Sequence, residues 1–356
     1  MTPQFRALEP HEQPACLQLW TQVFSPGADY FVRYFEEPLW KPEYTRVCEV
    51  DGRLVSAVQI VRRAVRLNGQ AVPMAGIANV ATLPEYRGRG FSTQLMRDAQ
   101  RVMDAEDFLF GLLFTGIHDF YARLGWERVP FPLWSATPQP LALDGWRFRT
   151  AEPDDLPRVQ VWYAQSYADH PLSVVRDDAY WRIWTRWDDP NWRRAFYIAE
   201  DSLTARGYVV LETHHCTLPD GTRRVSAISV QEVGAAPNDT EAFQKLIGFA
   251  IQMAVSAEAE AIRFFLPRSD VERWVRPFLP DVAPQPMGSA MVRVGVPERL
   301  WEAFEPFGAQ ARTAAQKLPP ALALAWLFGL ELPEIPDELY TLLPPRPACY
   351  SPVDSF

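Results

Sequence analysis

The sequence has few cysteines and no long apolar run. Four of its 356 residues are cysteine, and no two of them form a Cys-x-x-Cys pair. This usage excludes a disulfide-dense secreted scaffold and favours reduced thiols in a cytoplasmic protein. No segment approaches the roughly 18 uncharged apolar residues of a membrane helix, and the start, MTPQFRALEP, has no apolar core. The sequence therefore predicts neither a membrane span nor a signal peptide.

The sequence also lacks a net positive charge and two common phosphate-binding motifs. With 35 Lys and Arg against 44 Asp and Glu, the formal charge is −9, which argues against nonspecific nucleic-acid binding. The chain contains neither GxxxxGK[ST] nor a GxGxxG on a parallel βαβ unit, so a P-loop or dinucleotide fold is not predicted. His214-His215-Cys216 could suggest a metal, but neighbouring side chains on a strand point to opposite faces, and we predict no metal site.

What the sequence does contain is a set of elements sufficient for two or three domains. Apolar spacing predicts a helix within residues 8–24. Asp51-Gly52 and Asn68-Gly69 separate β-rich runs, so residues 45–83 are predicted to form three antiparallel strands. A helix from Ser92, a buried strand and a short helix then follow; the last two are predicted over residues 108–114 and 118–126.

The same order of elements recurs after a proline-rich boundary at residues 130–146, as a repeat of topology and not of sequence. The second set is a helix over 153–168, strands over 195–201, 205–213 and 223–233, a helix over 239–257 and a strand over 261–266. The predicted class is α/β (α+β), with two units that each hold a mixed, largely antiparallel sheet flanked by helices. The predicted domains are 1–135, 145–295 and a short proline-rich C-terminal region, 296–356.

The stretch TLPEYRGRGFSTQLM, residues 82–96, joins the first meander to its helix. A strand, a glycine-rich turn and a helix start together make an anion site, because the first helical amides lack internal partners. Glycines let the backbone approach a phosphate closely, and Arg87 and Arg89 can add charge-assisted hydrogen bonds. A solvated basic turn is the alternative interpretation, but the context favours a site for a phosphate or pyrophosphate.

These residues resemble the cofactor-binding core of the GCN5-related N-acetyltransferases (GNAT). The family pattern [Q/R]-x-x-G-x-[G/A] matches Arg87, Gly90 and Ser92, with serine in the final small-residue place. The resemblance implies that acetyl-CoA is the cofactor. It implies that the loop binds the pyrophosphate of coenzyme A through Arg87, Gly88, Arg89, Gly90, Phe91 and Ser92, and that the preceding strand pairs with the pantetheine arm through Val80, Ala81 and Thr82.

The doubled topology narrows the resemblance to the Eis-type (enhanced intracellular survival) acetyltransferases, which have two tandem GNAT folds. In that family only the first fold binds cofactor, and here only the first unit has the Arg-Gly loop. The segment from Tyr121 to Trp126, YARLGW, resembles the family segment that carries the general acid. The family's terminal phenylalanine places its carboxylate in the active site, and this chain ends in Asp-Ser-Phe. The C-terminal region is shorter than that of the family.

The resemblance thus implies direct acetyl transfer, with Tyr121 as general acid and the Phe356 carboxylate as base or orienting group. The alternatives are a core tyrosine and a frayed terminus. A backbone N–H of the Val80–Ala81 strand would support the oxyanion. His118 could assist proton transfer, although a hydrogen-bonded structural histidine is favoured.

The implied acceptor is a small-molecule cationic amine, such as an aminoglycoside, a polyamine or a lysine-like amine. An acidic and aromatic pocket would suit it; the candidates are Phe24, Asp29, Glu36, Trp40 and Asp354, with Tyr30 and Glu37 beside them. The resemblance also suggests a homo-oligomer. Two other functions stay open: another tandem-fold acyltransferase, for thiol-precursor or aminoacyl transfer, and an acyl-CoA-binding sensor without turnover.

Overall fold

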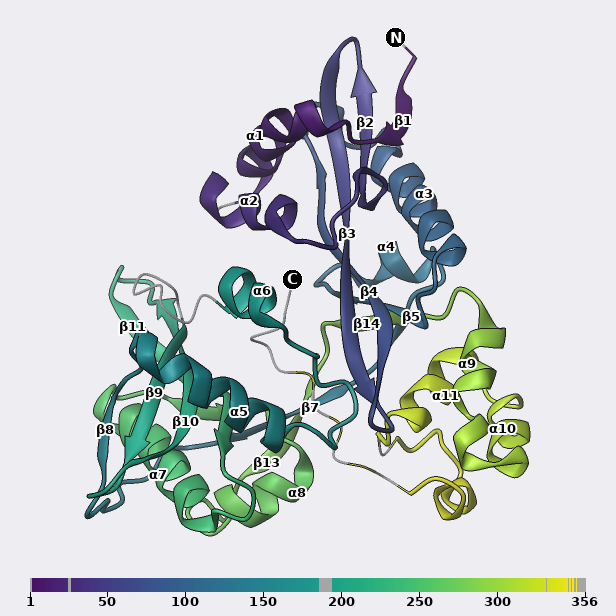
Figure 1. Ribbon diagram of the computed structural model, residues 1–356. Coiled ribbons are helices and arrows are strands. Elements are labelled where there is room, and N and C mark those ends of the chain that lie inside the picture. The colour runs from purple at the N-terminus through teal and green to yellow at the C-terminus, as the bar shows by residue number, and fades with distance from the viewer. Residues whose placement is uncertain are drawn as a thin grey trace.

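The computed structural model describes residues 2–24, 27–185, 194–330, 332–344, 346, 348 and 350. Within these residues the strands form two sheets of seven, and Figure 1 shows them as two lobes with a third, helical lobe beside the first. The predicted class, two successive α/β units with mixed sheets flanked by helices, is confirmed. Among the residues that the structure describes, no helix is long and apolar enough to cross a membrane.

The first sheet is built on the predicted meander. The turns Asp51-Gly52 and Asn68-Gly69 have φ between 49° and 77°, the left-handed backbone that a tight hairpin turn needs. The next strand lies parallel to the last strand of the meander. From one edge to the other the strands are β1 (Gln4–Ala7), β2 (Thr45–Val50), β3 (Arg53–Leu67), β4 (Gln70–Thr82), β5 (Phe110–Phe114), β14 (Ala290–Arg293) and β6 (Glu127–Arg128).

Helices cover both faces of this sheet. α3 (Phe91–Ala105) packs on β2, β3 and β4 from one side, and α1 (Gln13–Val23) packs on β3 and β4 from the other. The sequence predicts only one helix before the meander, but α2 (Ala28–Glu36) follows α1 and packs on it. The fully buried Trp20 ring lies 5.6 Å from the Phe31 ring of α2. A helix this short depends on such packing, because its own nucleation is unfavourable.

The second sheet repeats the topology of the first. α5 (Leu156–Ser166) and α7 (Thr240–Ser256) pack on its two faces: Tyr208 and Val210 lie in the core under α5, and Val209 and Leu211 lie in the core under α7. From one edge to the other the strands are β13 (Ala283–Met287), β7 (Phe131–Ala136), β12 (Ala261–Phe264), β11 (Arg223–Ala235), β10 (Ala205–Thr217), β9 (Arg194–Glu200) and β8 (Arg147–Thr150).

The repeat extends to a short stretch of sequence, so the prediction of a topological repeat without a sequence repeat is wrong at this place. Residues 6–12 are RALEPHE and residues 149–155 are RTAEPDD. In the first unit, the Arg6 guanidinium donates to both carboxylate oxygens of Glu12, at 2.6 and 2.7 Å, and to Glu49 of β2 at 2.6 Å. One arginine therefore joins β1, the turn before α1, and the neighbouring strand.

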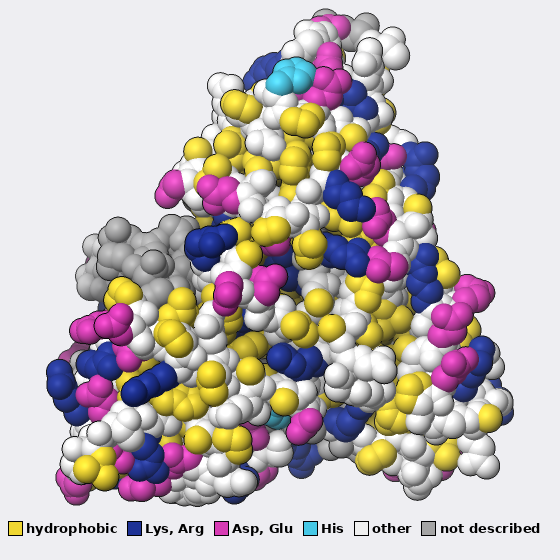
Figure 2. All heavy atoms as spheres, in the orientation of Figure 1, with side chains coloured by type: hydrophobic (Ala, Val, Ile, Leu, Met, Phe, Trp, Pro, Cys, Tyr) yellow, Lys and Arg dark blue, Asp and Glu magenta, His cyan; other side chains and the backbone are white. Residues whose placement is uncertain are grey.

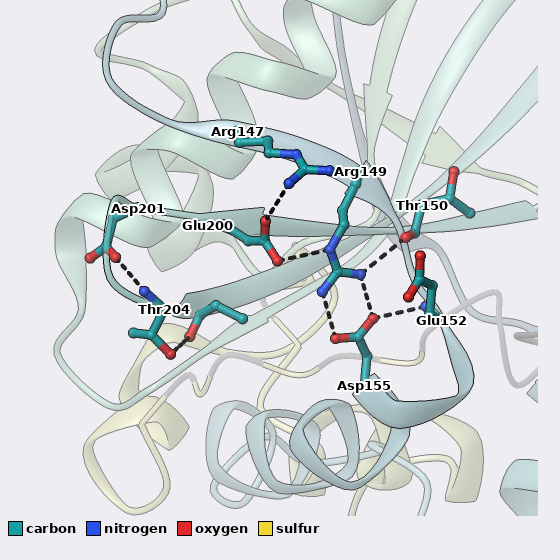
Figure 3. Close-up of polar contacts among 9 residues, drawn as sticks. Arg147, Arg149, Thr150, Glu152, Asp155, Glu200, Asp201 and Thr204 are labelled. Carbon is teal, nitrogen blue, oxygen red and sulfur yellow. Dashed lines mark hydrogen bonds and ion pairs between the residues drawn. The ribbon is translucent and has the colours of Figure 1, made fainter.

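The second unit has the same arrangement, which Figure 3 shows. Arg149 of β8 donates to both carboxylate oxygens of Asp155, at 2.5 and 2.9 Å, and to Glu200 of β9 at 2.8 Å. The Asp155 carboxylate also accepts from the Glu152 backbone N–H, as Glu12 accepts from the corresponding N–H of Glu9. The same residues thus fix the first strand to the first helix in both units.

The two sheets exchange strands. Residues 131–136, inside the predicted proline-rich boundary, form β7 and pair with β12 of the second sheet. After β13 the chain returns, and β14 enters the first sheet between β5 and β6. A hydrogen bond of 3.2 Å from Val129 N to the Ala290 carbonyl continues the pairing between the sheets. A two-stranded ribbon, β6–β7 against β13–β14, therefore belongs to both units.

The C-terminal region is helical and packs on the first unit rather than extending as a tail. It contains α9 (Pro297–Ala303), α10 (Ala309–Ala315) and α11 (Pro320–Leu327), which Figure 1 shows beside β5 and β14. Arg299 donates to the backbone carbonyls of Asp104 at 3.0 Å and Phe108 at 3.1 Å. Trp326 of α11 is fully buried, and its indole N–H donates to the Leu343 carbonyl at 3.1 Å.

Candidate active site

A bulge bends β4 at the residues that the sequence assigns to the cofactor. Asn79 has φ of +50°, and the register between β3 and β4 shifts between Ala57 and Gln59. Beyond the bulge, Ala81 and Thr82 pair with β3 again. Such a bulge redirects a strand and leaves one residue unpaired in the ladder.

The opposite edge of β4 is open beyond the bulge. β4 and β5 pair only from Met74–Phe110 to Gly76–Leu112, although β4 continues to Thr82. Among the described residues, no strand pairs with this edge of β4 after Gly76. The edge, which includes Val80 and Ala81, therefore presents backbone groups with which an extended, amide-containing ligand can pair.

The Arg-Gly loop lies at the end of this edge and starts α3. Gly88 and Gly90 have φ of +77° and +78°, and a Cβ added at either meets nothing within 4 Å. Glycine is thus needed here for its backbone conformation and not for lack of space. No described residue accepts a hydrogen bond from the amides of residues 88–93. The start of this 15-residue helix, which includes Phe91 and Ser92, therefore has unpaired backbone N–H groups that can bind an anion.

Three hydroxyl groups tie the end of β4 to the start of α3. Ser56 donates to the Ala81 carbonyl at 2.7 Å, its Oγ lies 2.7 Å from Thr82 Oγ1, and Thr82 Oγ1 lies 2.6 Å from Ser92 Oγ. Each hydroxyl has one proton, so Thr82 donates to Ser56 and Ser92 donates to Thr82. Ser92 therefore anchors the loop. The sequence analysis does not predict a role for Ser56, because nothing in the local sequence indicates that a serine 26 positions before Thr82 contacts it.

The two loop arginines are exposed at the site. Arg87 Nε donates to the Thr82 carbonyl at 3.2 Å, and Arg89 Nη2 donates to the Glu85 carbonyl at 3.3 Å. The Arg89 guanidinium also lies over the Tyr86 ring, 5.0 Å from its centroid. These contacts hold both guanidinium groups at the Arg-Gly loop, where they add positive charge near the start of α3.

Tyr121 lies in a buried position on α4 (His118–Ala122), the short helix after β5. Burial raises the pKa of its phenol to about 12. Gln100 of α3 donates to the Leu124 carbonyl at 2.7 Å, which ties the turn after α4 to the helix that follows the Arg-Gly loop. The His118 ring donates through Nε2 to the Gly288 carbonyl at 2.6 Å, which supports the structural interpretation of this histidine.

The predicted acceptor residues divide into two groups. Phe24 and Trp40 lie in one aromatic cluster: Phe24 contacts Phe31 at a ring distance of 6.0 Å, and Trp40 contacts Phe35 at 5.3 Å. The Trp40 indole N–H is used within the fold, donating to Thr45 Oγ1 at 3.0 Å.

Asp29 and Glu36 form the second group and are exposed on α2. Glu37 behaves differently, because it pairs with the buried Arg63 at 3.1 Å and also accepts from the Trp184 indole N–H. The Glu37 carboxylate therefore joins Arg63 of the first unit to Trp184 of the second, and it is already paired within the fold. The remaining candidates, Asp354 and Phe356, lie outside the described residues.

The described part of the C-terminal tail reaches the first sheet. The Tyr350 ring lies 5.8 Å from the ring of Phe114, the last residue of β5, and Tyr350 is 8% exposed. α4 and Tyr121 follow Phe114 directly in the chain. Six residues remain after Tyr350, enough chain to span up to about 20 Å.

Comparison with known families identifies the first unit. Residues 4–129 match the family model described as an acetyltransferase (GNAT) domain. No curated protein matches the sequence.

Solved structures extend the likeness to both units. A GCN5-related N-acetyltransferase from Anabaena variabilis ATCC 29413 is 18% identical with a TM-score of 0.62, over 85% of this chain and 75% of that one. A probable N-acyltransferase from Enterococcus faecalis V583 has the same identity and coverage and a TM-score of 0.63. Eis1 from Mycobacterium abscessus is 17% identical with a TM-score of 0.58, over 85% and 76% of the two chains. At these identities the structures show the shared fold.

Proposed function

We propose that the chain is a GNAT-type acyltransferase, because its residues 4–129 match a GNAT acetyltransferase domain, and that it transfers the acetyl group of acetyl-CoA to a cationic amine. One observation carries this proposal: an open strand edge leads directly into a helix-start anion site. That combination suits a ligand whose amide-bearing arm ends in a pyrophosphate, as coenzyme A does.

The loop and strand have distinct tasks in this proposal. The amides of residues 88–93, with Arg87 and Arg89, bind the pyrophosphate. The β4 edge at Val80, Ala81 and Thr82 pairs with the pantetheine arm. This binding holds the thioester beside α4, and a backbone N–H at the β4 bulge stabilises the oxyanion that forms when the amine attacks.

Tyr121 assists departure of the thiolate. A phenol with a pKa of about 12 is neutral at pH 7, so its O–H is present as a donor. It is a weaker acid than a thiol, whose ordinary pKa is about 8.5. Tyr121 therefore acts first as a hydrogen-bond donor to the sulfur as the C–S bond breaks, and its proton moves to the sulfur only as the thiol leaves.

The amine loses a proton when its nitrogen bonds to the acetyl carbon. We assign that proton to the Phe356 carboxylate, which either accepts it or orients the ammonium group while water takes it. The supporting observation is the packing of Tyr350 on Phe114, which brings the tail to the end of β5. Asp29, Glu36 and Asp354 provide negative charge, and Phe24 and Trp40 provide aromatic surface, for a cationic acceptor.

The test is coenzyme A release from acetyl-CoA against a panel of aminoglycosides, polyamines and lysine-like amines, using protein with an unmodified C-terminus. Tyr121→Phe and removal of Phe356 should each lower kcat about 10²–10⁴-fold and leave acetyl-CoA binding unchanged. Tyr197→Phe, a half-buried tyrosine of the second sheet, is the matched control and should leave kcat unchanged.

Each alternative outcome has a defined meaning. Binding of acetyl-CoA without release to any amine would favour the sensor. Release only with a bulkier acyl or aminoacyl donor would favour the other tandem-fold acyltransferases. Full activity after removal of Phe356 would keep the enzyme and refute the role of the terminal carboxylate.

A further inference from the structure

Arg346 connects the C-terminal helices to the first sheet at the point where the tail begins. Its Nη2 donates to the Leu327 carbonyl at the end of α11, and its Nη1 donates to Asn68 Oδ1 in the turn between β3 and β4. Its guanidinium lies over the Phe307 ring, 5.2 Å from the centroid. One side chain therefore bridges two parts of the fold that are far apart in the sequence.

The backbone of Arg346 is held as closely as its side chain. Its N–H donates to the Gly329 carbonyl at 3.1 Å. Gly329 has φ of +74°, and a Cβ there would lie 2.5 Å from Arg346 N. Glycine is required at 329 both for its backbone conformation and for this close approach. The tail therefore leaves the helical region from one defined position.

The partners of Arg346 show that the side chain serves geometry rather than charge pairing. The guanidinium donates to a backbone carbonyl and to a side-chain amide oxygen, both neutral, and burial lowers its pKa. If position 346 served packing alone, an apolar side chain would suffice there. A planar guanidinium, in contrast, can donate to two acceptors in fixed directions, which a lysine cannot do.

The two described residues beyond Arg346 also pack on the protein. Ala348 N donates to the Arg346 carbonyl at 2.7 Å, and Ala348 and Tyr350 are both buried. The Tyr350 ring packs on Phe114 at the end of β5. Arg346 thus sets the starting point of a path that reaches the end of β5 within four residues.

We propose that Arg346 is a positioning residue, which holds the tail so that the Phe356 carboxylate reaches the acceptor amine. The inference rests on the proposed role of that carboxylate, and it names the residue that positions the carboxylate. Arg346 touches neither substrate nor cofactor in this proposal, so its removal should affect turnover and leave cofactor binding intact.

The first test compares Arg346→Ala with Arg312→Ala, which removes an exposed arginine of the same helical region paired with Glu305 at 2.7 Å. Arg346→Ala should lower kcat at least tenfold with unchanged affinity for acetyl-CoA, and Arg312→Ala should change neither. Asn68→Gly removes one acceptor of Arg346 and tolerates the φ of +52°, so it should lower kcat by a smaller factor. It supplies the test if Arg346→Ala does not fold.

The second test combines Arg346→Ala, or Asn68→Gly if needed, with removal of Phe356. If Arg346 acts through the terminus, the double variant should be no slower than the variant that lacks Phe356 alone. Rate losses that multiply would overturn the proposal and make Arg346 an ordinary stabilising residue. Full activity of Arg346→Ala, together with a loss of activity on removing Phe356, would refute only the role of Arg346 and leave that of the terminal carboxylate. Full activity without Phe356 would refute both this inference and the proposed terminal carboxylate.

Discussion

At the scale of single residues, burial of Tyr121 leads to a specific pH dependence. Its raised pKa, about 12, keeps the phenol protonated up to that pH, and the donor is lost only as the pH rises through it. We therefore expect no fall in kcat from Tyr121 between pH 7 and about 10. The measurement is kcat against pH at saturating amine. A falling limb near pH 10 that disappears in Tyr121→Phe would contradict the assigned environment.

Gly90 offers a second prediction. An added Cβ meets no neighbouring atom within 4 Å, so a substitution there tests only the requirement for a positive φ. Gly90→Ala should weaken acetyl-CoA binding about 5–30-fold, since a left-handed backbone costs an alanine about 1–2 kcal/mol. Gly90→Asn should weaken it less, because asparagine adopts this conformation more readily. Calorimetric dissociation constants decide the order. If Gly90→Asn binds acetyl-CoA more weakly than Gly90→Ala, glycine is required because the ligand approaches the backbone closely, and not because of the positive φ.

At the residue level, the sequence alone predicts local backbone structure where the residues involved are neighbours in the chain. The Arg-Gly loop is recognisable because its glycines, arginines and helix start are adjacent, and all of them lie at one helix N-terminus. Ser56, Gln100 and Arg346 could not be predicted, because each acts through a partner that only the fold brings near. Whether Tyr121 and Phe356 are catalytic stays a prediction.

At the scale of elements, the paired arginine motifs make a prediction about stability. Arg6→Met and Arg149→Met should each lower the free energy of unfolding by about 1 kcal/mol at pH 7, because a carboxylate loses two charge-assisted bonds. The matched control is Arg276→Met, whose exposed pair with Glu272 should contribute little. Thermal unfolding measures the differences, and equal losses in all three variants would contradict the special role of the motif.

The same motif should respond to acid. Arg6 lowers the pKa of Glu12, and Arg149 lowers the pKa of Asp155. Groups with a lowered folded pKa stabilise the fold above their unfolded pKa, about 4, and lose that contribution as the pH falls through the folded value. The difference in melting temperature between the wild type and Arg149→Met should therefore be smaller at pH 3 than at pH 7. A difference that stays constant would mean that packing, not charge, is lost.

Elements were predictable where turn chemistry or periodicity marks them. Asp51-Gly52 and Asn68-Gly69 identify their hairpins because few residues tolerate such turns. β14 has four residues, and its identity as a strand depends on β5 and β6 on either side. The repeated motif was detectable in principle, because Arg-x-x-Glu-Pro occurs at residues 6–10 and 149–153. It is short, and its meaning becomes clear only from the shared geometry (Figure 3).

At the scale of the whole molecule, the exchanged strands predict which fragments fold. Residues 1–135 contain the whole stretch that matches the family model, yet they lack β14, which pairs with β5 and β6. We expect this fragment to unfold without a cooperative transition. Residues 1–129 joined through Asn-Gly to residues 290–356 restore the sheet, since β6 and β14 are antiparallel neighbours. Circular dichroism on heating both fragments gives the comparison, and cooperative melting of residues 1–135 would refute it.

The strand exchange also has a consequence for synthesis on the ribosome. The first sheet stays incomplete until residues 290–293 emerge, and all of residues 129–289 must be translated in between. At about 5–20 residues per second this delay is on the order of ten to thirty seconds. During that interval the edges of β5 and β6 that later receive β14 lack their partner, and such edges attract other chains. The nascent protein is therefore most exposed to aggregation, and most in need of a chaperone, before its second half is complete.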